Sequence, residues 1–63
     1  MKKVKQLRGF VIGQGQDLTS NASYDFHVYT ADEWAYGSGL RYADWDCDSI
    51  AEAVEWIGSE NAR

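Results

Sequence analysis

Three stretches of alternating hydrophobic and polar side chains predict three β-strands in the first two thirds of the chain. The first covers positions 4–12, and the second covers positions 24–30, where aromatic and β-branched residues are frequent. The third covers positions 34–42 and is rich in aromatic residues, but Gly37 and Gly39 interrupt it. We expect these glycines to bend or bulge that strand.

A helical pattern follows near the end of the chain. The hydrophobic residues with the i, i+3, i+4, i+7 spacing of one helix face are Ile50, Ala53, Val54 and Ile57. Ser49 and Glu52 form a capping box, in which each side chain satisfies a backbone N–H that the first turn leaves unpaired. Gly58 is expected to end the helix as a left-handed cap, so the tail at positions 59–63 is expected to fray.

These elements predict an α+β domain in which a three-stranded antiparallel sheet is followed by one C-terminal helix packed on one face, in the order β-β-β-α. Positions 1–63 are expected to form a single domain, with a polar, flexible loop at about 13–23. A chain this short buries only about 60% of the surface that its unfolded form exposes. Because Cys47 is the only cysteine, no disulfide can compensate, and we expect tight packing or a partner to do so.

The charges are divided unevenly along the chain. Lys2, Lys3, Lys5 and Arg8 precede every acidic residue, and the remaining positions carry ten acids against two arginines, a net charge of −8. This acidic body repels a phosphate backbone and attracts a basic surface. The chain has no apolar run long enough for a membrane span and no signal-peptide pattern, so we expect a cytoplasmic protein with no membrane contact.

One acidic spacing matches a calcium-binding loop. Asp44, Asp46, Asp48 and Glu55 stand at positions one, three, five and twelve of an EF-hand pattern. The glycine that such a loop needs at position six is Ser49 here, and no room remains for an entering helix. A strand-to-helix connection with helix capping explains the same acids. We therefore expect no metal site and no cofactor.

Catalytic chemistry has little support in the sequence. The only thiol and the only imidazole belong to Cys47 and His27, and no spacing places them together. Acids on both sides of Cys47 disfavour its thiolate form. A domain of 63 residues also has little volume in which to enclose a substrate. We therefore expect that this protein is not an enzyme.

Aromatic residues are too numerous for one thin core. Nine occur in the chain, and one sheet face under one short helix cannot cover them all. Tyrosine and tryptophan dominate the hot spots of protein interfaces, whereas the alternative is that the extra rings support the core. The residues predicted to contact a partner combine rings with neighbouring acids: Asp32, Glu33, Trp34, Tyr36, Asp44, Trp45 and Asp46.

These features favour a small acidic protein-binding module that docks on a partner with a basic surface. That surface could be the nucleic-acid groove of an enzyme, where carboxylates would stand in for phosphates. In size, charge and composition the chain resembles small phage and mobile-element proteins that inhibit host or defence enzymes, which implies the host cytoplasm as its location. Two alternatives are a single-stranded nucleic-acid binder that uses the basic N-terminus and strand aromatics, and a self-associating structural subunit such as a homodimer.

Overall fold

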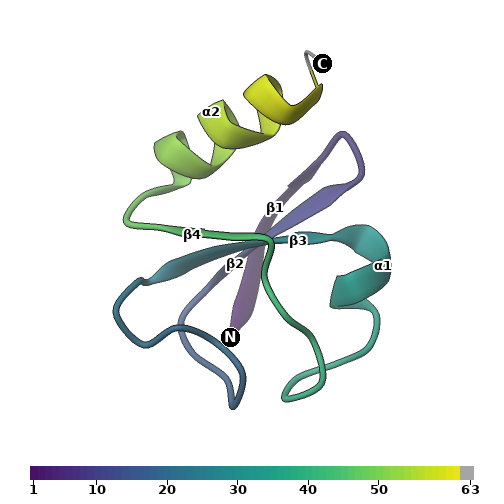
Figure 1. Ribbon diagram of the computed structural model, residues 1–63, viewed down its shortest axis with the longest axis vertical. Helices are drawn as coiled ribbons and strands as arrows, with labels where there is room; N and C mark the ends of the chain where they lie inside the picture. Colours follow the sequence, from purple (N-terminus) through teal and green to yellow (C-terminus); the bar gives the residue numbers. More distant parts are fainter. Residues whose placement is uncertain (62–63) are drawn as a thin grey trace.

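The computed structural model describes residues 1–61, and its centre is a four-stranded antiparallel sheet whose strands lie in sequence order (Figure 1). A one-turn helix, α1, follows the third strand, and a longer helix, α2, follows the fourth. The elements in chain order are β1 (Lys2–Leu7), β2 (Phe10–Gln14), β3 (Phe26–Thr30), α1 (Ala31–Trp34), β4 (Trp45–Cys47) and α2 (Ile50–Asn61). The α+β class, the antiparallel sheet and the C-terminal helix are confirmed.

The predicted three strands and the order β-β-β-α are wrong. The predicted strand at positions 4–12 is a hairpin of β1 and β2 that turns at Arg8 and Gly9. The predicted strand at positions 34–42 contains the end of α1 and part of the loop that follows it. The last strand is β4, which pairs antiparallel with β3 in a stretch that we expected to be a polar connection.

Local hydrogen bonding explains why the chain forms α1 after β3. The Thr30 hydroxyl accepts a hydrogen bond from the backbone N–H of Glu33 at 3.1 Å, which caps the helix. Asp32 and Glu33 place negative charge at the positive end of the helix dipole. Gly37 and Gly39 then turn the chain with positive φ angles of 96° and 83°. The aromatic residues around them therefore do not continue as a strand.

The connection between β1 and β2 is a two-residue turn. Leu7 pairs with Phe10, and both intervening residues have positive φ, 51° for Arg8 and 82° for Gly9. Positive φ at both positions is typical of a type I′ turn, which favours Asn-Gly. A long side chain such as that of arginine is strained in left-handed backbone.

Replacing Arg8 with asparagine should therefore stabilise the protein. We expect the Arg8→Asn variant to gain about 0.5 kcal/mol in free energy of unfolding, measured by urea denaturation. Lys5→Asn is the control, because Lys5 is also exposed but lies in extended backbone, where asparagine is unfavourable. An unchanged or lower urea midpoint for Arg8→Asn would contradict strain at this turn.

Helix α2 covers one face of the sheet and forms the hydrophobic core with it. The buried residues of this core are Ile12, Val28, Cys47, Ala53 and Ile57. The N-terminus of α2 is capped, because Ser49 Oγ accepts a hydrogen bond from the Glu52 N–H at 3.2 Å. The Glu52 carboxylate accepts in turn from the Asp48 N–H at 2.9 Å. The predicted helix face therefore points at the sheet, although Ile50 in its first turn is exposed.

Helix α2 is longer than expected. It continues to Asn61, so Gly58 lies within the helix instead of ending it. The tail that we expected from position 59 is helical up to Asn61. Positions 62 and 63 of that expected tail lie outside the described residues.

Loops and α1 cover the opposite face of the sheet, which the sequence did not predict to be buried. Val11, His27 and Tyr29 point away from α2 and are buried. Trp34 meets the Tyr29 ring edge-on at 5.3 Å, and the buried Arg41 side chain stacks on Trp34. We call these five residues the loop-side core. The sheet is thus covered on both faces, in contrast to the one covered face that we predicted.

Hydrogen bonds close the base of the loop between β2 and β3 and tie the loop to Arg41. The Gly15 N–H donates to the Asp25 carbonyl at 2.8 Å, and the Gln16 side chain donates to the Tyr24 carbonyl at 2.7 Å. Positions 13 and 14, which we assigned to this loop, belong to β2. Asp17 Oδ2 pairs with Arg41 Nε at 3.3 Å, and the Thr19 hydroxyl donates to the Arg41 carbonyl, so the loop is also tied to the loop-side core.

Candidate functional site

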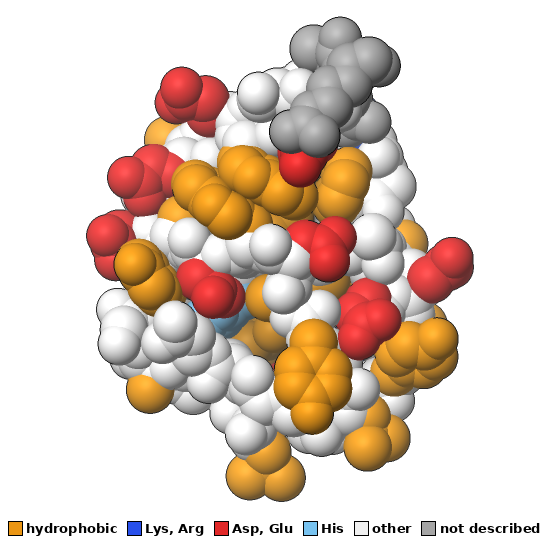
Figure 2. Space-filling view, viewed as in Figure 1, with side chains coloured by type: hydrophobic (Ala, Val, Ile, Leu, Met, Phe, Trp, Pro, Cys, Tyr) orange, Lys and Arg blue, Asp and Glu red, His pale blue; other side chains and the backbone are white. Residues whose placement is uncertain are grey.

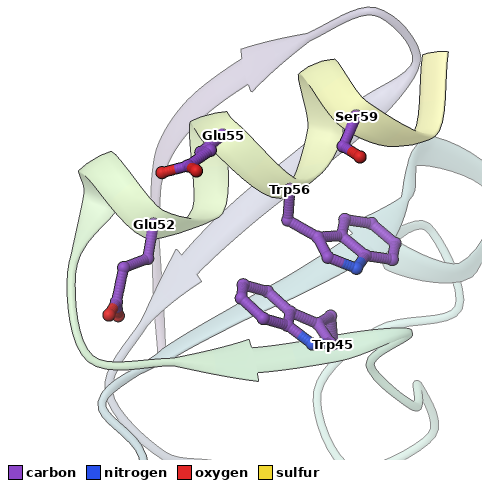
Figure 3. A pocket seen from close by; sticks show the side chains of 5 residues that line it. All are labelled: Trp45, Glu52, Glu55, Trp56 and Ser59. Carbon is purple, nitrogen blue, oxygen red and sulfur yellow. The ribbon is translucent and has the colours of Figure 1, made fainter. Parts of the chain in front are cut away.

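A groove of about 290 Å³ lies between α2 and β4 (Figure 3). Its lining residues are Trp45, Glu52, Glu55, Trp56 and Ser59. Trp45 comes from β4 and the other four come from α2, where spacings of three or four residues place side chains on one side of a helix. We call this surface the α2–β4 groove.

Two stacked indole rings form one wall of the groove. The ring centroids of Trp45 and Trp56 are 5.6 Å apart with an angle of 8° between their planes, and Figure 3 shows the Trp56 ring extending from α2 towards Trp45. Phe10 meets Trp56 edge-on at 5.7 Å, which connects the pair to the hydrophobic core. Trp45 remains 37% exposed. The pair is therefore anchored on one side and open to solvent on the other.

The groove is acidic. Glu52 and Glu55 are both exposed on α2. One oxygen of Glu52 accepts the hydrogen bond from the Asp48 N–H, whereas the Glu55 carboxylate has no hydrogen bond or ion pair with residues 1–60. Asp44 and Asp48, on either side of β4, are also exposed. These carboxylates favour a positively charged group in or beside the groove.

The predicted contact residues do not form one surface. Trp45 lines the groove, and Asp44 is exposed next to it in the chain. Asp32 and Tyr36 are exposed on and just after α1, away from the groove. Glu33 is half-buried, and its carboxylate accepts a hydrogen bond from a loop N–H at 2.9 Å. The acids near α1 and those near α2 are therefore separate groups.

Two other predicted residues lie on the loop-side face of the sheet. Trp34 is half-buried against Tyr29, on the face opposite α2. Asp46 pairs across the strands with His27, and its carboxylate contacts that buried ring. Both side chains thus support the fold on this face.

The sequence prediction missed Glu52, Glu55, Trp56 and Ser59 as groove residues. Their spacing marks one side of a helix, and this was the available signal. That side becomes a groove only because β4 places Trp45 beside it. Because β4 was not predicted, the second wall of the groove was missing from the prediction.

The only imidazole and the only thiol point to opposite faces of the sheet. The His27 ring is fully buried, with Nδ1 2.6 Å from Asp46 Oδ1 and Nε2 3.0 Å from the Gly15 carbonyl oxygen. Cys47 lies in the core under α2, and its thiol donates to the Ser49 carbonyl at 3.4 Å. Burial raises the pKa of the Cys47 thiol. The two side chains therefore form no nucleophile–base pair.

The segment from Asp44 to Glu55, whose acids have the spacing of a calcium-binding loop, is not folded as a loop. It runs through β4 and into α2, and its members have separate surroundings. Asp46 contacts His27, while the Asp48 N–H and Ser49 take part in capping α2. Across residues 1–61, no group of three or more His, Cys, Asp or Glu side chains is arranged to hold a metal ion.

No protein family, curated protein or solved structure matches this chain. None of the helices in the described part of the chain is long and apolar enough to cross a membrane. The chemistry of the α2–β4 groove is therefore the basis for a functional proposal.

Proposed function

We propose that this protein is a binding module that docks the α2–β4 groove and its acidic surroundings on a basic surface of a partner protein. The supporting observation is the face of the molecule that Figure 2 shows. Hydrophobic side chains gather beneath α2 with acidic side chains around them, and no lysine or arginine of the described residues is visible in this view. Exposed tryptophan within a ring of like charges combines a hot-spot residue with electrostatic steering.

Surfaces that bind nucleic acids are basic, so they are candidates for such docking. Carboxylates facing such a surface take the places of phosphates and compete with DNA or RNA. A protein with this property inhibits an enzyme by covering its nucleic-acid site. Inhibition of this kind is also what the resemblance to small phage and mobile-element inhibitors in size, charge and composition implies.

The arrangement of the strands gives less support to direct nucleic-acid binding. A single-strand binder needs basic side chains beside exposed rings on which bases stack. Lys2, Lys3 and Lys5 lie on β1, whereas Trp45 lies on β4, and these strands form the two opposite edges of the sheet. Charged residues on an edge strand also prevent strand pairing between molecules, which is a sufficient role for the lysines.

The proposal predicts that Trp45 contributes strongly to partner binding. Tagged protein should capture a partner from a lysate of its cell at low salt, and high salt or added DNA should release that partner. The Trp45→Ala variant should lose about 2 kcal/mol of binding free energy in titrations with the partner then identified by mass spectrometry. Its far-UV circular dichroism should keep the helix signal.

The matched control for this prediction is Tyr42→Ala. Tyr42 is another exposed ring, 66% accessible, in the loop that follows α1. This variant should bind as well as the unchanged protein. Equal loss in both variants would exclude the groove as the docking surface. Recovery of the protein alone, with a dimer mass on a sizing column, would replace the proposal by self-association.

A further inference from the structure

One guanidinium is already held between an indole and a carboxylate in this protein. In the loop-side core, Cζ of Arg41 lies 3.5 Å from the centroid of the Trp34 ring. Nε of Arg41 lies 3.3 Å from Oδ2 of Asp17. The ring quadrupole attracts the cation, while the planar guanidinium matches the geometry of the carboxylate. The site has three components: an indole, a carboxylate and a cation.

The α2–β4 groove contains the first two components without the third. Trp45 exposes its indole, and the Glu55 carboxylate has no hydrogen bond or ion pair within residues 1–60. Glu52 supplies a second carboxylate, of which one oxygen is bonded to the Asp48 N–H. Among residues 1–61, Arg41 provides the only cation that stacks on an aromatic ring. The groove therefore lacks a cation that its own described residues could supply.

We infer that the α2–β4 groove binds an arginine side chain of the protein partner. The guanidinium stacks on the exposed indole of Trp45 and pairs with the carboxylates of Glu52 and Glu55. Figure 3 shows these three side chains among those that line the groove. This inference rests on the proposed function, because it names the group by which the partner's basic surface is anchored. The surrounding acids then steer the partner, and the groove selects the contact.

The size and shape of the groove favour one side chain over a larger ligand. Its volume of about 290 Å³ is at the lower limit of small-molecule pockets, which begin at roughly 300 Å³. Arginine fits the lining better than lysine does. Its planar group stacks on an indole and donates to two carboxylates at once, whereas the lysine ammonium is a compact and strongly hydrated charge.

The test is an NMR titration of the ¹⁵N-labelled chain of residues 1–63. The ligands are a capped glycine–arginine repeat peptide and a glycine–lysine repeat of equal length and charge. We expect the indole N–H signals of Trp45 and Trp56 to shift, while that of Trp34 stays in place. Affinity for the arginine peptide should exceed that for the lysine peptide by about fivefold, the effect of one stacked cation.

Matched variants separate the groove from general electrostatic attraction. Glu55→Gln removes one exposed carboxylate from the groove and should lower the affinity for the arginine peptide by about fivefold. Asp32→Asn removes one exposed carboxylate from α1 and should leave the affinity nearly unchanged. Because both residues are exposed, neither variant is expected to unfold. Equal effects of the two variants would overturn the assignment to the groove.

Other results of the peptide titrations would overturn the arginine site. Equal affinity for the two peptides would overturn arginine selectivity while leaving the acidic docking surface in place. Absence of binding to either peptide would overturn the arginine site, and the capture experiment would then judge the proposed function independently. Arg63 lies outside the described residues and is a cation of the same chain. Markedly tighter peptide binding by Arg63→Ala would assign the groove to that residue instead of a partner.

Discussion

The Arg41→Met variant should lose about 3 kcal/mol or more in free energy of unfolding, because it leaves the Asp17 carboxylate buried without its cation. The Arg41 and Asp17 side chains are only 8% and 2% exposed. Arg41 also donates from Nη1 to the Trp34 carbonyl at 3.3 Å, and its backbone carbonyl contacts the Thr19 hydroxyl. One side chain therefore joins the β2–β3 loop to the loop that follows α1.

Urea denaturation followed by far-UV circular dichroism measures this loss. In a domain of this size, a loss of about 3 kcal/mol is a large part of the total stability, so Arg41→Met is expected to unfold at a much lower urea concentration. Arg41→Lys keeps the charge but loses the planar stack on Trp34, and it should show a smaller loss in a folded protein. The double variant Asp17→Asn/Arg41→Met should lose less than the sum of the two single variants. Additive losses would contradict direct coupling between the two side chains.

The ion pair of Asp17 and Arg41 also predicts how the free energy of unfolding depends on pH. Burial alone would raise the pKa of Asp17, but hydrogen bonds from Thr19 and Arg41 outweigh it and hold this pKa below its ordinary value of 3.8. A lowered pKa stabilises the folded state when the carboxylate is ionised in both states. This contribution is present in full above about pH 4 and is lost as the pH falls through the lowered pKa. Asp17→Asn should remove this part of the acid dependence.

Local patterns predicted the elements that depend on local interactions. Alternation predicted a strand at 24–30, of which positions 26–30 form β3, and helical spacing with the Ser49 cap predicted the start of α2. The β1–β2 hairpin was missed because Arg8-Gly9 lacks the asparagine that normally indicates such a turn. β4 was missed because aspartate is rare in strands, although Asp44 to Asp48 alternate with Trp45 and Cys47. In this stretch the alternation was the stronger signal.

The loop-side core and the groove depend on contacts between distant parts of the chain. Asp17 and Arg41 are 24 positions apart, and both lie in loops, so no periodicity relates them. Composition alone identified Trp45 as a candidate contact residue, and the structure places it in the groove. It also suggested Trp34, whose ring instead packs on Tyr29. Residue type thus selects candidates, while the strand pairing decides which of them face solvent.

Gly13 shows how closely the loop-side core is packed. It is buried in β2, opposite His27 on β3. A Cβ atom added there would lie 2.6 Å from Sδ of Met1 and 2.9 Å from Cζ3 of Trp34. Met1 is flexible and can shift, but the Trp34 ring is fixed between Arg41 and Tyr29. Glycine is therefore required at this position by the close approach of an aromatic ring and not by its backbone conformation.

The Gly13→Ala variant should accordingly lose about 2 kcal/mol in free energy of unfolding, the usual effect of overpacking a core. Gly58→Ala is its matched control, because a Cβ there would have no heavy atom within 4 Å and the residue lies inside α2. That substitution should raise the free energy of unfolding by about 0.5–1 kcal/mol, since alanine favours a helix more than glycine does. Urea denaturation of both variants measures two changes of opposite sign. Destabilisation by Gly58→Ala would indicate the left-handed helix end first expected at Gly58, and an unchanged Gly13→Ala would contradict the packing of Trp34 against β2.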